Sequence, residues 1–120
     1  MNNSLLTLKK EHKKYPKEWV YSLLLKVDIV RVVQKFISLK RRKKNKSEYI
    51  AQKGCPFHKE KTPSFTVSQT KQFYHCFGCG VHGNVINFLM EYNYWTFEES
   101  VRYLARLYKV KLPYRKTKKK

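Results

Sequence analysis

The chain has few acidic residues: 8 Asp and Glu stand against 27 Lys and Arg in 120 residues, for a formal net charge of +19. Acidic residues this scattered are incompatible with a two-metal active site, which needs carboxylates gathered around its ions. The sequence also has no Gly-rich phosphate loop of the Walker type and no nucleophile beside a base. These absences argue against an enzyme active site within the chain.

The sequence also lacks long apolar runs and an even number of cysteines. No stretch of 18 apolar residues exists, so the sequence predicts no transmembrane helix and no membrane partner. The N-terminal MNNSLLTLKK becomes charged before any apolar segment of signal-peptide length. Three cysteines cannot form a closed set of disulfides. We therefore expect a cytoplasmic protein whose cysteines bind a metal in a reducing compartment.

The positive charge is unevenly distributed. Residues 1–46 carry 14 basic and 3 acidic side chains, residues 47–112 carry 8 and 5, and residues 113–120 carry 5 and none. The densest run follows Leu39 and is interpreted as a solvated basic loop. Clusters of this kind bind phosphate backbones, although they also keep proteins soluble and are attracted to acidic membrane surfaces. We expect nucleic-acid contacts from Arg41, Arg42, Lys43 and Lys44.

These composition changes predict the domain boundaries. We expect a basic arm over residues 1–15, one folded domain over residues 16–113 and a basic tail over residues 114–120. Apolar residues at helical spacing, together with capping residues, predict four helices in the domain. The four are a helix from Pro16 to Val27, a short helix capped by Asp28 with Phe36 on its apolar face, a helix capped by Asn84, and a helix that starts at the Thr96–Glu99 capping box, has Tyr108 on its apolar stripe and ends at Leu112-Pro113.

Two short segments with period-two alternation, 64–68 and 72–76, predict a β-hairpin. Two pairs of metal-ligand residues flank this hairpin, Cys55-Pro-Phe-His58 and Cys76-Phe-Gly-Cys79, with 17 residues between them. A two-residue spacer lets one tight turn direct both of its donors at the same ion, and Gly78 and Gly80 supply backbone freedom there. Four donors of this type predict one structural Zn²⁺ with a closed shell. The alternative is a set of ordinary buried cysteines with an incidental histidine.

Two other histidines compete for the fourth ligand position. His75 precedes Cys76 directly, so in a strand it points to the opposite face. His82 follows the second turn too closely to fold back. Both are predicted to be surface or stacking residues. The fold class that follows is α+β: a small zinc ribbon with an antiparallel hairpin sheet and a Cys-His-Cys-Cys site, packed with N- and C-terminal helices.

Aromatic residues are dense around the predicted metal site. Most of them are expected to fill a core, but one exposed beside a lysine would stack on unpaired bases. The sequence does not indicate which aromatic side chain is exposed. The five aromatic residues concerned are Phe57, Phe65, Phe73, Tyr74 and Phe77.

The segments from Cys55 to Ser68 and from Lys71 to Gly80 resemble the CHC2-type zinc ribbon of bacterial DnaG-type DNA primases. The similarity extends over residues 16–113, although the loop from Lys40 to Lys53 is longer and more basic than the family pattern. It implies a domain that binds single-stranded template DNA and acts in the initiation of RNA primers during DNA replication at the fork. The residues that carry over are the zinc ligands Cys55, His58, Cys76 and Cys79 and the DNA contacts Lys61, Lys71, Phe65 and Phe73.

The resemblance also implies a partner. The family's polymerising domain, with its acidic metal site, is absent before Lys120, so we expect the chain alone to make no primers. A primase catalytic core would act with it in cis or in trans. Two alternatives stay open: a free-standing zinc-ribbon regulator that binds nucleic acid without any link to priming, and a decayed reading frame that keeps only the fold.

Overall fold

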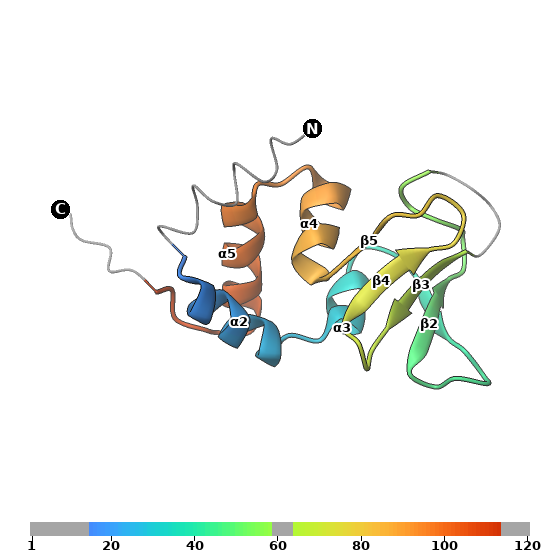
Figure 1. The fold of residues 1–120 in the computed structure, drawn as a ribbon, viewed down its shortest axis with the longest axis horizontal. Coiled ribbons are helices and arrows are strands. Elements are labelled where there is room, and N and C mark those ends of the chain that lie inside the picture. Colours follow the sequence, from blue (N-terminus) through green and yellow to red (C-terminus); the bar gives the residue numbers. More distant parts are fainter. Residues whose placement is uncertain (1–14, 59–63, 114–120) are drawn as a thin grey trace. The chain divides into compact units, whose positions relative to one another are not determined.

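The computed structural model describes residues 15–58 and 64–113, which divide into two compact units (Figure 1). The described part of the first unit is 15–27 with 95–113, and the second unit is 28–94. The predicted basic arm up to residue 14, the basic tail and the predicted DNA contact Lys61 lie outside the described residues. None of the helices in the described ranges is long and apolar enough to cross a membrane.

The first unit contains two helices, α2 (Lys17–Lys26) and α5 (Phe97–Leu107), which pack on each other. Tyr15, which the sequence analysis placed in the basic arm, is fully buried in this unit. Its ring lies 5.6 Å from that of Trp19 and 6.2 Å from that of Phe97. The Trp19 indole N–H donates to the Lys111 carbonyl at 3.0 Å and ties the segment after α5 to α2.

Helix α5 begins with the predicted capping box. The Glu99 backbone N–H donates to the Thr96 hydroxyl at 3.0 Å, and the Glu99 carboxylate accepts from the Thr96 backbone N–H at 2.8 Å. The two bonds satisfy backbone N–H groups that have no partner within the helix. The apolar stripe is buried from Phe97 to Ala105, while Tyr108 forms the C-cap instead of extending the helix.

The second unit contains an antiparallel sheet of five strands. The strands run in sequence order as β1 (Leu39–Arg41), β2 (Glu48–Ala51), β3 (Phe65–Ser68), β4 (Phe73–Cys76) and β5 (His82–Gly83). The predicted hairpin is β3–β4, in which Phe65 pairs with Cys76 and Ser68 with Phe73. The other three strands were not predicted, because each is short and carries a charged or polar residue.

The basic segment after Leu39 is not entirely a loop, which corrects the prediction. Lys40 and Arg41 lie in β1 and pair with Ile50 and Tyr49 of β2. β1 is an edge strand, where lysine is common because its charge opposes pairing with another sheet. Charge therefore marks this segment as an edge rather than as unstructured chain.

Two helices, α3 (Ile29–Val33) and α4 (Val85–Asn93), pack on one face of this sheet. The Phe88 ring of α4 lies 6.4 Å from Phe65 and 5.8 Å from Tyr74. Phe65 has no exposed surface, so it cannot stack on a base, and the prediction that Phe65 contacts DNA is wrong. The helices take one face of β3, and alternation along that strand directs Phe65 toward them.

Both helices begin as predicted, with Asp28 and Asn84 as N-caps. α3 ends at Val33, so the predicted Phe36 lies beyond it, in the turns that follow. The Asp28 carboxylate also accepts from the Gln69 side chain at 2.8 Å. Gln72, at a left-handed φ of 54°, accepts from the Ile29 backbone N–H at 2.7 Å. These bonds hold the β3–β4 turn, and Lys71 within it, against the start of α3.

Candidate metal centre

Two turns bring the predicted ligands together. Cys55 and His58 lie in the turn after β2, and Cys76 and Cys79 lie at the end of β4 and in the turn that follows. The sulfur and ring nitrogen atoms of these four residues all lie within 4.8 Å of one another. A tetrahedral ion with bonds of about 2.0–2.3 Å to nitrogen and sulfur needs donors at such separations. The four side chains can therefore hold one metal ion.

Backbone geometry prepares both turns for sulfur ligands. The N–H of Phe57 donates to the Cys55 sulfur at 3.4 Å, and the N–H of Gly78 donates to the Cys76 sulfur at 3.3 Å. N–H donors stabilise negative charge on sulfur, which is the form that binds metal. Gly80, with a φ of 83°, reverses the chain after Cys79. The predicted freedom at Gly78 is not used, because only Gly80 of the two adopts a positive φ.

The pKa values of two cysteines show how the site responds to a bound cation. Burial raises the pKa of the Cys55 thiol to about 12. Burial also acts to raise the pKa of Cys76, but the backbone N–H groups of Cys79 and Gly78 and the neighbouring Cys55 outweigh it and lower that pKa. The folded site thus favours the thiolate form of Cys76, whereas the thiolate form of Cys55 requires a cation beside it. A Cys₃His set is a closed tetrahedral shell for Zn²⁺ and leaves no position for a reacting water.

The first ligand turn is anchored by an aromatic residue between its two ligands. The Phe57 ring lies 5.8 Å from Phe65, 5.9 Å from Tyr74 and 5.8 Å from Phe88. The sequence analysis assigned Phe57 to the core by default. Because Phe57 stands between Cys55 and His58, the packing of its ring in the core helps to position these two ligands.

The two competing histidines lie on the opposite face of the sheet, which the sequence predicted for His75. His75 pairs with His82 across β4 and β5, and neither belongs to the ligand cluster in the described residues. The His82 ring lies 5.8 Å from Phe73 and 6.2 Å from His75, and the His75 ring lies 4.5 Å from Phe77. We call these four rings, Phe73, His82, His75 and Phe77, the aromatic strip.

Zinc loading is expected to fall as the pH falls. The Cys55 thiol keeps its proton at neutral pH whether or not the site is folded, because its ordinary pKa is 9.0 and burial raises that pKa to about 12. The proton must therefore leave when zinc binds the thiolate. Protons therefore compete with zinc throughout the neutral range, and the apparent affinity should rise with pH. Titration against a chelating indicator at stepped pH measures this. A zinc affinity that does not change with pH would contradict the prediction.

Comparison with known proteins agrees with this geometry. The family model described as CHC2 zinc finger matches residues 15–120. The chain belongs to the CHC2 zinc finger family. This CHC2 zinc finger is 52% identical over 101 residues to the DNA primase of Haemophilus influenzae and 50% identical over 99 residues to that of Salmonella typhimurium. The matches cover 84% and 82% of this chain and 16% of each relative.

A solved structure shares the fold. The crystal structure of the Aquifex aeolicus primase, with its zinc-binding and RNA polymerase domains, matches this CHC2 zinc finger with a TM-score of 0.69 and 39% identity. The match covers 78% of this chain and 22% of the other. The α+β class, the antiparallel sheet and the primase-type zinc finger predicted from the sequence are confirmed. The chain spans about one sixth of the length of the DNA primases it matches.

Proposed function

We propose that this chain is the template-binding zinc finger of a DNA primase, with one zinc held by Cys55, His58, Cys76 and Cys79. In this proposal it binds single-stranded DNA on the sheet face opposite α3 and α4 and acts where RNA primers are initiated. The observation that carries the proposal is the aromatic strip, which lies on a face that neither helix of this unit covers.

The aromatic strip has the properties of a surface that stacks on bases. Phe73 is 37% exposed and Phe77 is 73% exposed, although both would be buried if they served only the core. Unpaired bases stack on such rings without regard to sequence, whereas the bases of a duplex are already stacked on one another. The proposed surface therefore favours single strands over duplex.

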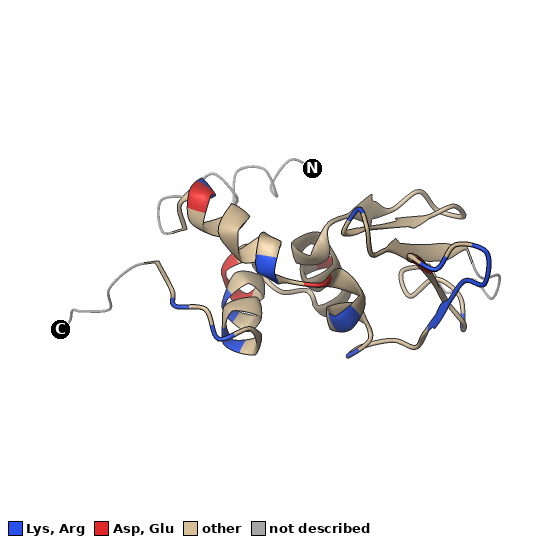
Figure 2. Cartoon of the chain, turned by 90° about the horizontal axis from the view of Figure 1, so that it is seen from below, with Lys and Arg blue, Asp and Glu red and all other residues tan. Residues whose placement is uncertain are grey.

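Cations lie at two places on this sheet, one beside the aromatic strip and one at the far edge. Lys71 is exposed in the β3–β4 turn, two residues before Phe73. In Figure 2 the longest continuous basic stretch of the described chain is the turn between β1 and β2. Arg42, Lys43 and Lys44 in this turn would attract a polynucleotide through its phosphates, with a strong dependence on salt. Arg41 is held on Tyr49, with its Nε donating to the Tyr49 hydroxyl at 3.1 Å.

Polymerisation is assigned to another domain. The described residues of the second unit contain only three acidic side chains, Asp28, Glu48 and Glu91, and Asp28 and Glu48 are engaged in the N-cap of α3 and an ion pair with Arg42. A primase catalytic core, in the same polypeptide or in a separate one, would supply the metal site that joins nucleotides. The proposed setting is the replication fork in the bacterial cytoplasm.

Substitution of Phe73 tests the proposed surface. We expect Phe73→Ala to weaken binding of a single-stranded oligonucleotide by about 1–3 kcal/mol, the usual value of one base stacked on one ring. Duplex binding should stay unchanged, because it depends on charge. Fluorescence anisotropy titrations of both DNA forms with the zinc-loaded chain measure the two affinities. Lys71→Ala should weaken both, since it removes a phosphate contact.

A matched control separates stacking from loss of structure. Tyr21→Ala removes an aromatic ring that is 65% exposed on α2, which belongs to the other unit, and should leave DNA binding unchanged. Thermal unfolding is followed for every variant, because Phe73 is also partly packed. If the folded wild-type chain binds single strands and duplex equally, and Phe73→Ala changes neither, the proposed surface is wrong and charge alone binds DNA.

A second measurement separates the primase role from that of a regulator. We expect the chain, added to a primase core that lacks its own zinc finger, to restore primer initiation on a single-stranded template, and the Phe73→Ala variant to restore less. A preference for single strands without any restoration would favour a free-standing nucleic-acid-binding regulator.

A further inference from the structure

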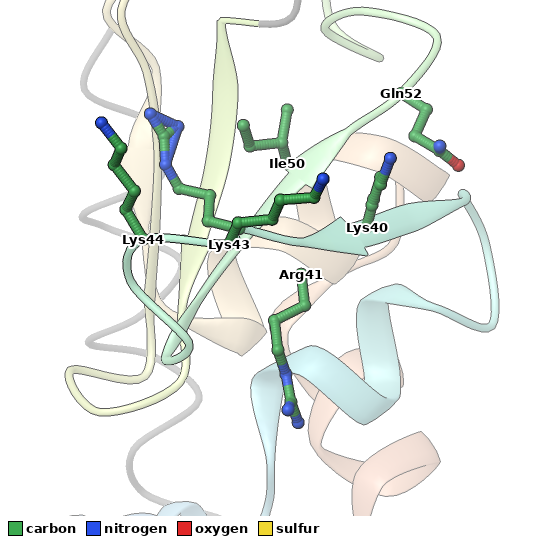
Figure 3. A pocket seen from close by; sticks show the side chains of 7 residues that line it. Lys40, Arg41, Lys43, Lys44, Ile50 and Gln52 are labelled. Carbon is green, nitrogen blue, oxygen red and sulfur yellow. The ribbon is translucent and has the colours of Figure 1, made fainter.

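A cationic pocket of about 520 Å³ opens beside the β1–β2 turn (Figure 3). Five of the seven residues that line it are Lys or Arg, and the other two are an aliphatic side chain and an amide. We call it the hairpin pocket. Its lining residues are Lys40, Arg41, Arg42, Lys43, Lys44, Ile50 and Gln52.

Three lysines supply the uncompensated charge of the hairpin pocket. Arg42 forms an ion pair with Glu48 at 3.4 Å, and the Arg41 guanidinium lies 5.6 Å from the centre of the Tyr49 ring. Figure 3 shows Arg41 pointing away from the side of β1 on which Lys40 and Ile50 lie. Lys40, Lys43 and Lys44 have no ion-pair partner among the residues that the structure describes. All three line the hairpin pocket.

Such a density of charge suits a compact anion better than an extended one. Neighbouring phosphates of a polynucleotide are separated by sugars, so a pocket of this size receives little of a strand's charge. The phosphates of a triphosphate are joined directly and carry their charge within a small volume. Several ammonium groups around one space match that arrangement, because each can donate to a different phosphate oxygen.

The remaining two lining residues add an apolar surface and an amide. Ile50 lies on the same side of the hairpin as the lysines and offers an apolar surface for a base or a sugar. The side-chain amide oxygen of Gln52 accepts from the Ser38 hydroxyl at 3.3 Å, which leaves the side-chain amide N–H groups of Gln52 as donors. A few polar groups beside an apolar surface are typical of small-molecule sites.

The hairpin pocket lies apart from the aromatic strip. Lys40 is on β1, at one edge of the sheet, and His75 is on β4, three strands away. At the usual spacing of hydrogen-bonded strands, this separation is about 14 Å. A ligand of nucleotide size in the hairpin pocket would therefore leave the aromatic strip accessible.

We propose that the hairpin pocket binds the triphosphate group of a nucleoside triphosphate or of the 5′ end of an RNA. This second ligand goes beyond the proposed template binding, in which Lys43 and Lys44 attract the strand by charge but the aromatic strip holds it. Both sources share the triphosphate, and Lys40, Lys43 and Lys44 recognise it in either case. The aromatic strip takes no part.

Calorimetric titration of the zinc-loaded full chain with ATP and with AMP tests the proposal, with the zinc content measured before and after. We expect the triple variant Lys40→Gln, Lys43→Gln, Lys44→Gln to bind ATP roughly tenfold more weakly, since each exposed ion pair adds a modest amount. The control variant Lys26→Gln, Lys35→Gln, Lys111→Gln removes the same charge from exposed positions outside the hairpin pocket. It should lose about twofold or less.

The proposal is overturned if ATP and AMP bind equally, or if both triple variants lose affinity equally, because the attraction would then be diffuse. It is also overturned if an oligodeoxynucleotide without terminal phosphates displaces ATP, because the hairpin pocket would then hold the strand backbone. RNAs with and without a 5′-triphosphate distinguish the two sources. Phe73→Ala should leave ATP binding unchanged, so failure here and failure of template binding are separable.

Discussion

Removal of zinc is expected to unfold the second unit. Structural zinc contributes about 10–16 kcal/mol of apparent binding free energy in zinc-finger peptides at neutral pH, as much as or more than the total stability of most domains, about 5–15 kcal/mol. Chelation, or Cys76→Ala, should therefore abolish the dispersed amide signals of residues 28–94 in an NMR spectrum. Elemental analysis of the untreated protein should give one zinc per chain.

Two histidine variants provide the matched comparison for this prediction. His58→Ala removes a proposed ligand, while His82→Ala removes a histidine whose ring lies on the opposite face and donates from Nδ1 to the Gly80 carbonyl oxygen at 2.9 Å. The first should reduce zinc affinity severely, and the second should leave zinc content and the spectrum unchanged. A well-folded wild-type protein with substoichiometric zinc would show that the metal is not needed for the fold.

Truncation of Phe88 is expected to have the next largest effect. Phe88 has no exposed surface, and its ring lies 5.3 Å from Tyr92 and 5.8 Å from both Tyr74 and Phe57. Phe88→Ala should cost about 3–5 kcal/mol of unfolding free energy, because it loses buried surface and leaves a cavity. Denaturant titration of the zinc-loaded protein measures this cost. Loosening of Phe57 should also make zinc exchange faster.

An exposed phenylalanine is the control for this truncation. Phe77 is 73% exposed, and Phe77→Ala should change the unfolding free energy by about 0.5 kcal/mol or less. Zinc exchange should also stay as in the wild type. Equal losses of stability in the two variants would mean that the aromatic core does not support the metal site.

Local signals in the sequence determined the helix starts and the metal site. Asp28, Asn84 and Thr96 cap helices as predicted, because a cap depends on residues only a few positions apart. The ligand spacing determined the site for the same reason: each tight turn aims its own two donors, and one hairpin joins the turns. The identity of the four clustered residues therefore needed no structure.

Only the tertiary structure decided which face of each strand is exposed. Phe65 lies on β3 and Phe73 on β4, and the two looked equivalent in the sequence, yet Phe65 is covered by α4 and Phe73 is 37% exposed. The strand pairing of Lys40 and the hairpin pocket around Ile50 were also beyond the sequence. Strand pairing depends on partners that local propensity does not record, and exposure depends on which elements pack where. The sequence by itself therefore determined the four residues of the metal cluster, while the packing of the second unit decided which aromatic and basic side chains are exposed.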